Sequence, residues 1–315
     1  MGEWKIMSDA LKICVMLGGS SCERDVSLRS GAAVAEALRY LGYQVVELDP
    51  VDGKFKLSSD IDLVFLALHG TFGEDGTVQN ELDHLGVPYT GCSAEVSRLA
   101  FNKINTKRIC EKHGLITAKD KVIKDADSKL PIGLSLPLVL KPTMQGSSIG
   151  LEFVETACAW PNALRNAMKY GGPVMVEEKV VGREITVGIL GGESLPIVEI
   201  IPKQGDYDYT NKYTAGATDY VCPAQFNESL TRRIKSAAES SLMALGGGDC
   251  ARVDFIVRDD GEPVLLEVNT LPGMTSTSLL PRAAKEAGLN FFELCQRLVE
   301  LALKPVNHLT QTESI

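Results

Sequence analysis

Short apolar runs alternate with an amphipathic stretch in the first part of the chain. The predicted elements are strands at 13–17, 45–48 and 63–68 and a helix at 28–41. Strands that alternate with helices in this way are typical of a parallel α/β layer. Ligands of such sheets bind beyond the carboxyl ends of the strands. The small-residue turn at 18–21 and His69, which both follow predicted strands, are therefore candidate site positions, although a plain tight turn explains the first equally well.

The rest of the chain has longer and less regular elements. A predicted helix that carries Lys103 and Lys107 is followed by a short apolar strand ending at Lys141 and by a small-residue loop at 145–150. Backbone amides of such a loop can approach phosphate oxygens closely, but a solvated turn remains an open alternative. The polar and aromatic stretch 206–213 predicts a lid loop. Further predicted elements are strands at 173–176 and 183–190 and helices at 228–245, 280–287 and 291–303.

The stretch 252–269 alternates between an apolar and a polar face and predicts a β-hairpin that turns at Asp260-Gly261. The predicted cross-strand pairs are Arg252 with Asn269, Asp254 with Glu267, and Ile256 with Leu265. The predicted apolar face consists of Val253, Phe255, Val257, Val264, Leu266 and Val268. The hairpin therefore brings two carboxylates face to face on one side and a continuous apolar surface on the other.

Two opposed carboxylates on a strand pair require a compensating positive charge. Their Cβ atoms lie about 4.5 to 5.5 Å apart, where like charges destabilise the pair. Oxygen ligands of this kind suit magnesium or manganese, and magnesium held by few carboxylates usually shares its shell with substrate phosphates. Asp254 and Glu267 therefore indicate nucleotide phosphate chemistry. The alternative is that both are ordinary solvated residues on an exposed strand face.

Length, composition and charge limit the class of protein. A chain of 315 residues is long for one hydrophobic core and predicts two or three domains. A hydrophobic content of 44% and a charged content of 23% are typical of a globular protein. A net charge of -9 argues against nucleic acid or an anionic membrane as the main partner.

Cysteine usage and apolar runs indicate the compartment. The eight cysteines form no C-x-x-C pair, which predicts reduced and mostly buried thiols rather than a disulfide framework or a zinc site. No run approaches the ~20 apolar residues of a membrane span, and no signal-peptide pattern is present at the N-terminus. We therefore expect a cytoplasmic protein.

Five segments, taken in chain order, resemble the D-alanine:D-alanine ligase family of ATP-grasp enzymes. These segments are 17–27, 69–76, 141–150, 209–213 and 267–275. The resemblance implies an α/β and α+β fold, in which an N-terminal parallel α/β domain (1–96) precedes the two lobes of an ATP-grasp fold (97–184 and 185–315). It also implies D-alanine and ATP as substrates, two Mg²⁺ or Mn²⁺ ions, a homodimer and a role in peptidoglycan precursor synthesis.

The resemblance assigns the nucleotide and metal residues. Lys103 and Lys141 would meet the ATP phosphates. The loop over the phosphates would contribute Gly146, Ser147 and Ser148, the adenine hinge would contribute Glu177, Glu178 and Val180, and Glu184 would bind the ribose. The implied metal ligands are Asp254, Glu267 and Asn269.

The resemblance also assigns the amino-acid site. Glu23 would receive the first ammonium in a hydrogen-bonded set with Ser147 and Tyr213, and His69 would lie beside the first carboxyl. The second carboxylate would be bound by Lys212, Ser278 and the amide of Leu279. The transferred phosphate and the oxyanion would be stabilised by Arg252 and by the amide of Gly273.

Two alternatives stay open at this stage. A D-alanine:D-lactate ligase or another D-amino-acid ligase has the same fold with a different second nucleophile, and Tyr213 at the end of the lid favours the dipeptide enzyme by resemblance. A non-catalytic ATP-binding protein of this fold would be expected to lack a phosphate lysine or a metal ligand, and this sequence has them all.

Overall fold

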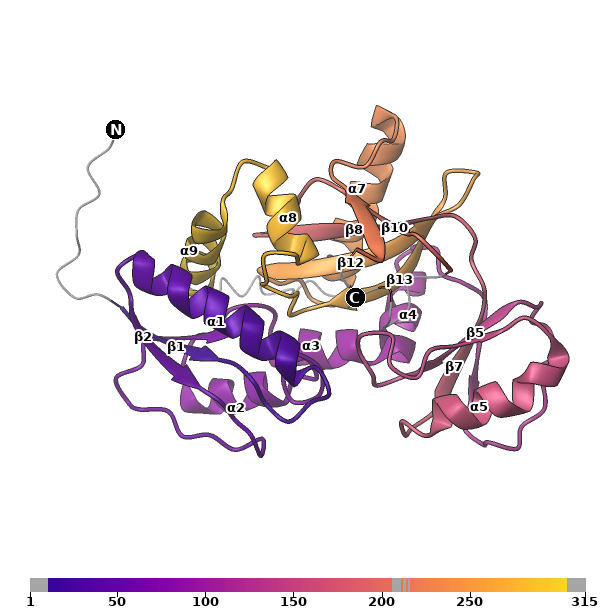
Figure 1. Ribbon diagram of the computed structural model, residues 1–315, viewed down its shortest axis with the longest axis horizontal. Coiled ribbons are helices and arrows are strands. Elements are labelled where there is room, and N and C mark those ends of the chain that lie inside the picture. The colour runs from indigo at the N-terminus through magenta and orange to yellow at the C-terminus, as the bar shows by residue number, and fades with distance from the viewer. Residues whose placement is uncertain (1–10, 206–210, 212–213, 215, 305–315) are drawn as a thin grey trace, which may run out of the picture.

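The computed structural model describes residues 11–205, 211, 214 and 216–304, and these contain three β-sheets. The sheets follow one another along the chain and lie in different parts of the molecule (Figure 1). The predicted lid residues 206–210, 212 and 213 and the tail beyond Pro305 lie outside the described residues.

The N-terminal layer is the predicted parallel α/β unit. Its three strands are parallel and run in the order β2-β1-β3. The elements are β1 (Lys12–Met16), α1 (Arg24–Tyr40), β2 (Gln44–Leu48), β3 (Leu63–Leu66), α2 (Thr77–Leu85) and α3 (Ala94–Phe101). Helix α1 begins four residues before the predicted Leu28, because its first turn is polar and gives no apolar periodicity.

The central lobe is built on a four-stranded antiparallel sheet in the order β4-β7-β5-β6. Its elements are α4 (Lys103–Lys112), β4 (Asp120–Ile123), β5 (Leu138–Pro142), β6 (Glu152–Val154), the short 3₁₀ helix η1 (Ala157–Ala159), α5 (Trp160–Met168) and β7 (Val174–Glu178). The predicted helix through Lys103 is in fact two helices. Asn102 ends α3 and caps α4, because its side chain accepts hydrogen bonds from the amides of Ile104 and Asn105.

The C-terminal sheet is the largest, with the path β11-β10-β8-β12-β13 and β9 paired to β8. Its elements are β8 (Arg183–Leu190), β9 (Glu193–Ser194), β10 (Val198–Pro202), β11 (Thr218–Val221), α7 (Glu228–Ala244), β12 (Cys250–Val257), β13 (Pro263–Asn269), α8 (Leu279–Glu286) and α9 (Phe291–Ala302). The predicted strand 183–190 is confirmed residue for residue, and the three predicted helices agree to within one residue at each end.

The hairpin β12–β13 confirms the register that matters for the site. Arg252 pairs with Asn269, and Asp254 pairs with Glu267. Strand β8 lies on the other side of β12, where Thr186 is the partner of Asp254. The carboxylate pair is therefore held in the interior of an antiparallel sheet rather than on a free ribbon.

Beyond Asp254 the predicted register is wrong by one residue. A β-bulge follows Asp254, so that Ile256 pairs with Val264 and not with Leu265. Leu265 consequently joins the core beneath the sheet, in place of the predicted Leu266. The turn also has three residues, since the amide of Arg258 donates to the carbonyl of Glu262 (3.0 Å) around the intervening residues.

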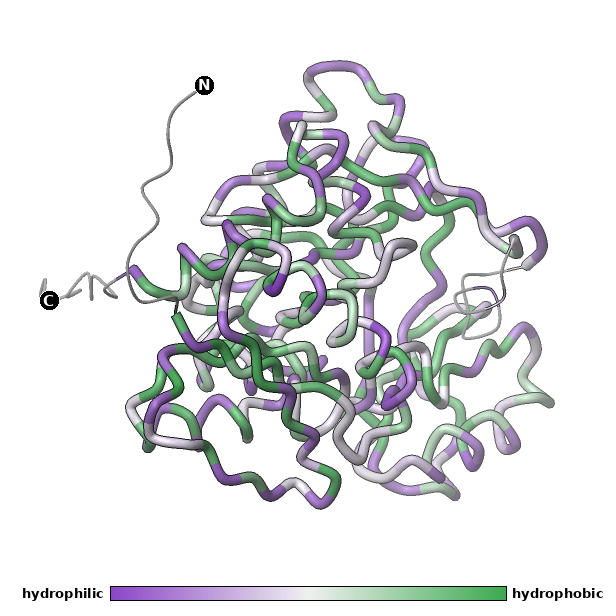
Figure 2. The backbone as a smooth tube through the Cα atoms, turned by 60° about the vertical axis from the view of Figure 1, so that its left-hand side comes forward, coloured by the Kyte–Doolittle hydropathy of each residue, from purple (hydrophilic) through white to green (hydrophobic). Residues whose placement is uncertain are grey.

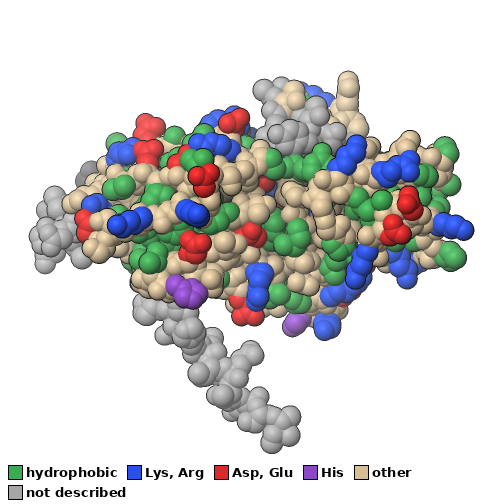
Figure 3. Space-filling view, turned by 90° about the horizontal axis from the view of Figure 1, so that it is seen from below, with side chains coloured by type: hydrophobic (Ala, Val, Ile, Leu, Met, Phe, Trp, Pro, Cys, Tyr) green, Lys and Arg blue, Asp and Glu red, His purple; other side chains and the backbone are tan. Residues whose placement is uncertain are grey.

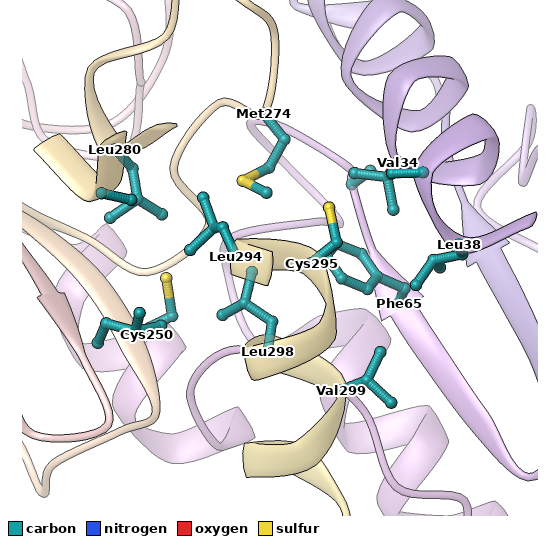
Figure 4. Packing of buried hydrophobic residues seen from close by; sticks show 14 of the residues in the cluster. Val34, Leu38, Phe65, Cys250, Met274, Leu280, Leu294, Cys295, Leu298 and Val299 are labelled. Atoms are coloured by element: carbon teal, nitrogen blue, oxygen red, sulfur yellow. The ribbon is translucent and has the colours of Figure 1, made fainter. Parts of the chain in front are cut away.

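One apolar core joins the N-terminal layer to the C-terminal helices. In Figure 4, Val34 and Leu38 of α1 and Phe65 of β3 lie beside side chains of α9. Leu280 of α8 and Cys250 of β12 approach the same helix from the opposite side (Figure 4). This shared core fixes the N-terminal layer relative to α8 and α9.

The remaining surface and cysteine features are ordinary. Hydrophobic and hydrophilic residues alternate along most of the tube in Figure 2, and no helix in the described parts of the chain is long and apolar enough to cross a membrane. Charged side chains of both signs are interspersed on the face in Figure 3. All eight cysteines are free, and five of them are buried, which confirms that the thiols are mostly buried.

Gly31 of α1 packs against Leu17, which directly follows β1, and we expect Gly31→Ala to destabilise the protein. An added Cβ would lie 2.3 Å from Cβ of Leu17, so one of the two elements must move. We expect the free energy of unfolding, measured by urea denaturation, to fall by about 1–3 kcal/mol. Ala32→Ser on the exposed side of the same helix is the control and should change it by less than about 0.5 kcal/mol. An alanine variant as stable as the parent would show that α1 packs differently.

Candidate active site

Two cavities meet at the centre of the molecule. The larger, of about 500 Å³, lies between α1, the end of β3 and the start of α8, and the smaller, of about 140 Å³, lies between β5, β7 and the hairpin. Both are lined by Lys103, Gln145, Arg252 and Glu267. The common wall is therefore formed mostly by charged side chains.

Every predicted site residue that the structure describes lines one of these two cavities. The larger cavity is lined by Glu23, His69, Gly146, Ser147, Asn269, Gly273, Ser278 and Leu279. The smaller cavity is lined by Lys141, Ser148, Glu177, Glu178, Val180, Glu184 and Asp254. Lys212 and Tyr213, predicted for the second substrate and the hydrogen-bonded set, lie outside the described residues.

Lys103 bridges the loop over the smaller cavity and the hairpin. Because Asn102 starts a new helix there, Lys103 occupies the first turn of α4 and points into the common wall. Its Nζ donates to the carbonyl of Gln145 (2.8 Å) and lies 3.0 Å from a carboxylate oxygen of Glu267. The lysine can therefore neutralise an anion located at the boundary between the cavities.

Lys141 belongs to a buried charge cluster. Its Nζ lies 2.6 Å from one oxygen of Glu177, whose other oxygen receives a hydrogen bond from Lys107 at 2.5 Å. Burial alone would raise the pKa of the Glu177 carboxyl, but the two ammonium groups outweigh it and hold that pKa below its usual range. Burial would likewise lower the pKa of Lys141, and the charge of Glu177 holds it above its usual range.

The ion pairs of Glu177 with Lys107 and Lys141 limit the contact that it could make with adenine. Because both carboxylate oxygens are paired with lysines, any contact with a base would come from its main chain. Glu178, also predicted for the hinge, accepts a hydrogen bond from the amide of Ser135 at 2.8 Å. The carboxylate of Glu177 therefore holds Lys141 in position in β5, and its side chain is not available to bind a base.

Arg252 and Asp254 form a bidentate ion pair in the lining of the smaller cavity. The Nε and an Nη of Arg252 donate to the two oxygens of Asp254, both at 2.9 Å. The hydroxyl of Thr186, across the sheet on β8, donates to one of the same oxygens at 2.5 Å. Both charged residues are buried, so the carboxylate is held in one orientation.

The two facing carboxylates of the hairpin are paired with side-chain cations, whereas the sequence led us to expect a metal ion as the compensating charge. Each of the two facing carboxylates already has a cation, since Asp254 is paired with Arg252 and Glu267 with Lys103. No group of three or more His, Cys, Asp or Glu side chains in the described ranges could hold a metal ion. The donor set of two carboxylates and the amide oxygen of Asn269 nevertheless fits magnesium, which takes few protein carboxylates and completes its shell with phosphate and water.

Glu23 lies at the tip of the N-terminal layer, directly before α1. Its carboxylate receives a hydrogen bond from the hydroxyl of Ser147, which comes from the central lobe. A Cβ at Gly146 would lie 2.9 Å from the same carboxylate, so a larger residue there would displace the end of the Glu23 side chain. Ser147 and Ser148 take left-handed backbone conformations, with φ of 51° and 57°, which non-glycine residues adopt at a cost and mostly at functional positions.

His69 lies at the end of β3, as predicted, and is buried. Its Nδ1 lies 3.5 Å from an oxygen of Glu74, and its Nε2 lies 3.3 Å from the hydroxyl of Ser30. Sequence reasoning missed Glu74 and Ser30, as well as Thr186 beside Asp254. Glu74 lies in the segment 69–76, whose resemblance to the ligase family was the only sequence feature that could have indicated it. Thr186 and Ser30 contact their partners only through the tertiary fold, so no local sequence pattern indicates them.

The segment after the hairpin also lines the larger cavity. Ser278 precedes α8, and its hydroxyl accepts a hydrogen bond from the amide of Thr275 at 3.0 Å. Leu279 is the first residue of α8, so its amide belongs to a helix N-terminus, where backbone N–H groups favour anions. A carboxylate could therefore bind here, in the cavity that Glu23 also lines.

Comparison with known families gives two matches that together span most of the chain. The family model described as "D-ala D-ala ligase N-terminus" matches residues 46–92, and the one described as "D-ala D-ala ligase C-terminus" matches residues 109–300. The D-alanine–D-alanine ligase of Methylacidiphilum infernorum (isolate V4) is 43% identical over 92% of this chain and 95% of its own length. That of Desulforamulus reducens is 44% identical over 94% of this chain and 99% of its own length.

Solved structures agree with these sequence matches. The crystal structure of D-alanine–D-alanine ligase from Bacillus anthracis complexed with ATP has a TM-score of 0.82 and 33% identity, covering 94% of this chain and 98% of that chain. The VanG D-Ala:D-Ser ligase from Enterococcus faecalis has a TM-score of 0.80 and 28% identity, covering 94% of this chain and 100% of that chain. Because the sequence matches extend over both ends of the fold, the chain belongs to the D-alanine–D-alanine ligase family.

Proposed function

We propose that this chain joins two D-alanine molecules with consumption of ATP, through a D-alanyl phosphate. The observation that carries the proposal is the common wall of the two cavities, formed by Lys103, Gln145, Arg252 and Glu267. ATP would occupy the smaller cavity and the two amino acids the larger. A phosphoryl group can then pass from one cavity to the other across a wall that neutralises its charge.

In the first step a carboxylate oxygen of the first D-alanine attacks the γ-phosphorus of ATP. The bond to the β-phosphate bridging oxygen breaks, and ADP leaves with that electron pair. Glu23 would hold the ammonium of this D-alanine, and Lys103, Lys141 and Arg252 would neutralise the transferred group. The rate comes mostly from positioning and charge stabilisation, since the protein forms no covalent bond.

In the second step the amine of the second D-alanine attacks the acyl carbon. Ser278 and the amide of Leu279 would hold its carboxylate at the start of α8, and the Gly273 amide would stabilise the oxyanion. The nitrogen gives up one proton, and the tetrahedral intermediate then expels inorganic phosphate, which keeps one oxygen from the first carboxylate. Water must be excluded until this step is complete, because acyl phosphates hydrolyse readily.

Divalent ions would be held by Asp254, Glu267 and Asn269, with Mg²⁺ or Mn²⁺ as the fitting metals. A bound ion of this kind supplies additional positive charge to the phosphates. Glu267 and Asp254 pair with Lys103 and Arg252 in the structure. To bind a metal ion, each carboxylate would have to contact the ion as well as its side-chain partner.

The alternative products differ only in the second substrate, and one assay separates them. We expect purified protein with ATP, Mg²⁺ and a mixture of D-alanine, D-serine and D-lactate to form D-alanyl-D-alanine as the main product by mass spectrometry. L-Alanine in place of D-alanine is the control and should release no phosphate from ATP. A D-alanyl-D-serine product would favour the specificity named for the VanG neighbour, and D-alanyl-D-lactate would favour the depsipeptide ligase. ATP binding without any product would favour the non-catalytic alternative.

The biological setting follows from the product. D-Alanyl-D-alanine is a peptidoglycan precursor. The reaction consumes ATP, and all eight cysteines are free thiols. Both features are consistent with synthesis in the cytoplasm. We also propose a homodimer, as the family resemblance implies. Sedimentation velocity at micromolar concentration tests that part of the proposal.

A further inference from the structure

Ser30 is a buried serine in the middle of α1 that the mechanism above does not use. It has no exposed surface, and its hydroxyl meets two groups that are distant in sequence. The first is Nε2 of His69, at 3.3 Å, and the second is the backbone amide of Met274, which donates to the hydroxyl at 3.2 Å. One side chain therefore links α1, the end of β3 and the loop that follows the hairpin.

The hydrogen bonds are mutually consistent in one arrangement. The Ser30 hydroxyl accepts from the amide of Met274 and can donate its own proton to Nε2 of His69. The other ring nitrogen, Nδ1, then carries its hydrogen toward Glu74, 3.5 Å away. The ring of His69 is thereby fixed in orientation, and each polar group of this buried set has a partner.

Met274 is held from its other side by the shared apolar core. Its side chain lies beside Leu280, Leu294 and Cys295, between α8 and α9, and is 3% exposed (Figure 4). The main chain at this point is therefore fixed twice, by packing of the side chain and by the hydrogen bond to Ser30. The residue immediately before it is Gly273, which lines the larger cavity.

We propose that Ser30 is a positioning residue for the ligation step, which aligns the main chain at Gly273 and Met274 with the ring of His69. This inference rests on the proposed function, because Gly273 is assigned there to the oxyanion. The physical argument is that Ser30 ties the loop that carries the oxyanion donor to the histidine beside the first carboxyl. Displacement of a catalytic group by about 1 Å can lower the rate by about 100-fold, even when the mutated residue is remote from the reacting atoms.

Ser30→Ala removes the hydroxyl without adding bulk, and Ser27→Ala is a closely matched control. Ser27 lies one turn earlier on the same face of α1, is equally buried, and also joins two segments, since it accepts from the amide of Gly18 and donates to the carbonyl of Ala67. It does not touch His69 or Met274 in any described contact. Both variants should lose comparable stability, because each leaves a buried donor and acceptor unpaired.

Two measurements distinguish positioning from a purely structural role. We expect hydrogen exchange of peptides that contain Met274 to accelerate at least 10-fold in Ser30→Ala and not in Ser27→Ala. We also expect dipeptide formation to fall about 10- to 100-fold, with more phosphate released than dipeptide formed, because the slower second step leaves the acyl phosphate exposed to water. The KM for ATP should not change.

The outcomes separate this inference from the function on which it rests. Unchanged exchange at Met274, or a phosphate-to-dipeptide ratio that stays at the parent value while both variants lose activity equally, would overturn the role of Ser30. A parent protein that makes no dipeptide would instead refute the proposed function. The exchange measurement would still decide whether Ser30 holds the loop in that case.

Discussion

Asp254→Asn is expected to lower kcat by about a thousand-fold or more while the fold is retained. The substitution keeps the size of the side chain and removes its negative charge. Arg252 then loses a charged partner that it now binds with two hydrogen bonds of 2.9 Å, and the hairpin loses one of its two facing carboxylates. The proposed metal site and the charge balance of the common wall both depend on that carboxylate.

The fold should survive because the packing of the hairpin does not involve this group. Val253, Phe255 and Val268 lie on the reverse face in the core beneath the sheet. We expect a loss of unfolding free energy of about 1–3 kcal/mol, from the weakened pairing of Arg252 and Thr186. Circular dichroism and urea denaturation measure this beside the steady-state assay. The control is Asp259→Asn at the exposed turn of the same hairpin, which should alter neither. A variant that unfolds while its residual activity per folded molecule is normal would assign Asp254 to stability alone.

Glu177→Gln is expected to have the largest effect on stability, a loss of about 3–5 kcal/mol. The carboxylate is buried between Lys107 and Lys141, at 2.5 and 2.6 Å, and the substitution leaves two buried ammonium groups without its charge. Urea denaturation at neutral pH measures the loss. The control is Glu155→Gln, whose carboxylate is 64% exposed and lies 3.7 Å from Lys179, and it should cost less than about 1 kcal/mol.

The loss of unfolding free energy in Glu177→Gln is expected to depend on pH, because the pKa of Glu177 is lowered in the folded protein. The pKa of Glu177 is lower in the folded protein than in the unfolded chain, so its contribution is present above the unfolded value of about 4.3 and is lost as the pH falls through the folded value. The stability difference between the parent and Glu177→Gln should therefore be constant near neutral pH and shrink as the solution is acidified below about pH 4. A difference that grows on acidification would contradict the assignment of the charge.

The hairpin shows which parts of the site could be predicted from the sequence. Alternation and the Asp-Gly turn were sufficient to place Asp254 opposite Glu267, because both signals are local. The bulge after Asp254 was not predicted, since no residue in the run marks it and the register is set by packing on β8 and the core. The error moved Leu266 into the apolar face, whereas the structure places it in the wall of the smaller cavity.

The charge partners show why the rest could not be predicted. Lys107 and Glu177 are 70 residues apart, and Thr186 reaches Asp254 from a neighbouring strand 68 residues away. Such pairs depend on the relative placement of whole elements, which periodicity does not report. For the same reason the sequence led us to expect a metal ion as the compensating charge on the hairpin, and did not indicate that Arg252 and Lys103 pair with the two carboxylates.

The central claim is that a phosphoryl group crosses the common wall from ATP onto a D-alanine carboxylate. The most direct measurement uses D-alanine labelled with ¹⁸O in both carboxylate oxygens and determines the isotope content of the phosphate released. Transfer through an acyl phosphate predicts one ¹⁸O atom in each inorganic phosphate and ¹⁸O in the new peptide carbonyl. Unlabelled phosphate released together with dipeptide would show that the carboxylate is not phosphorylated, and would contradict the account.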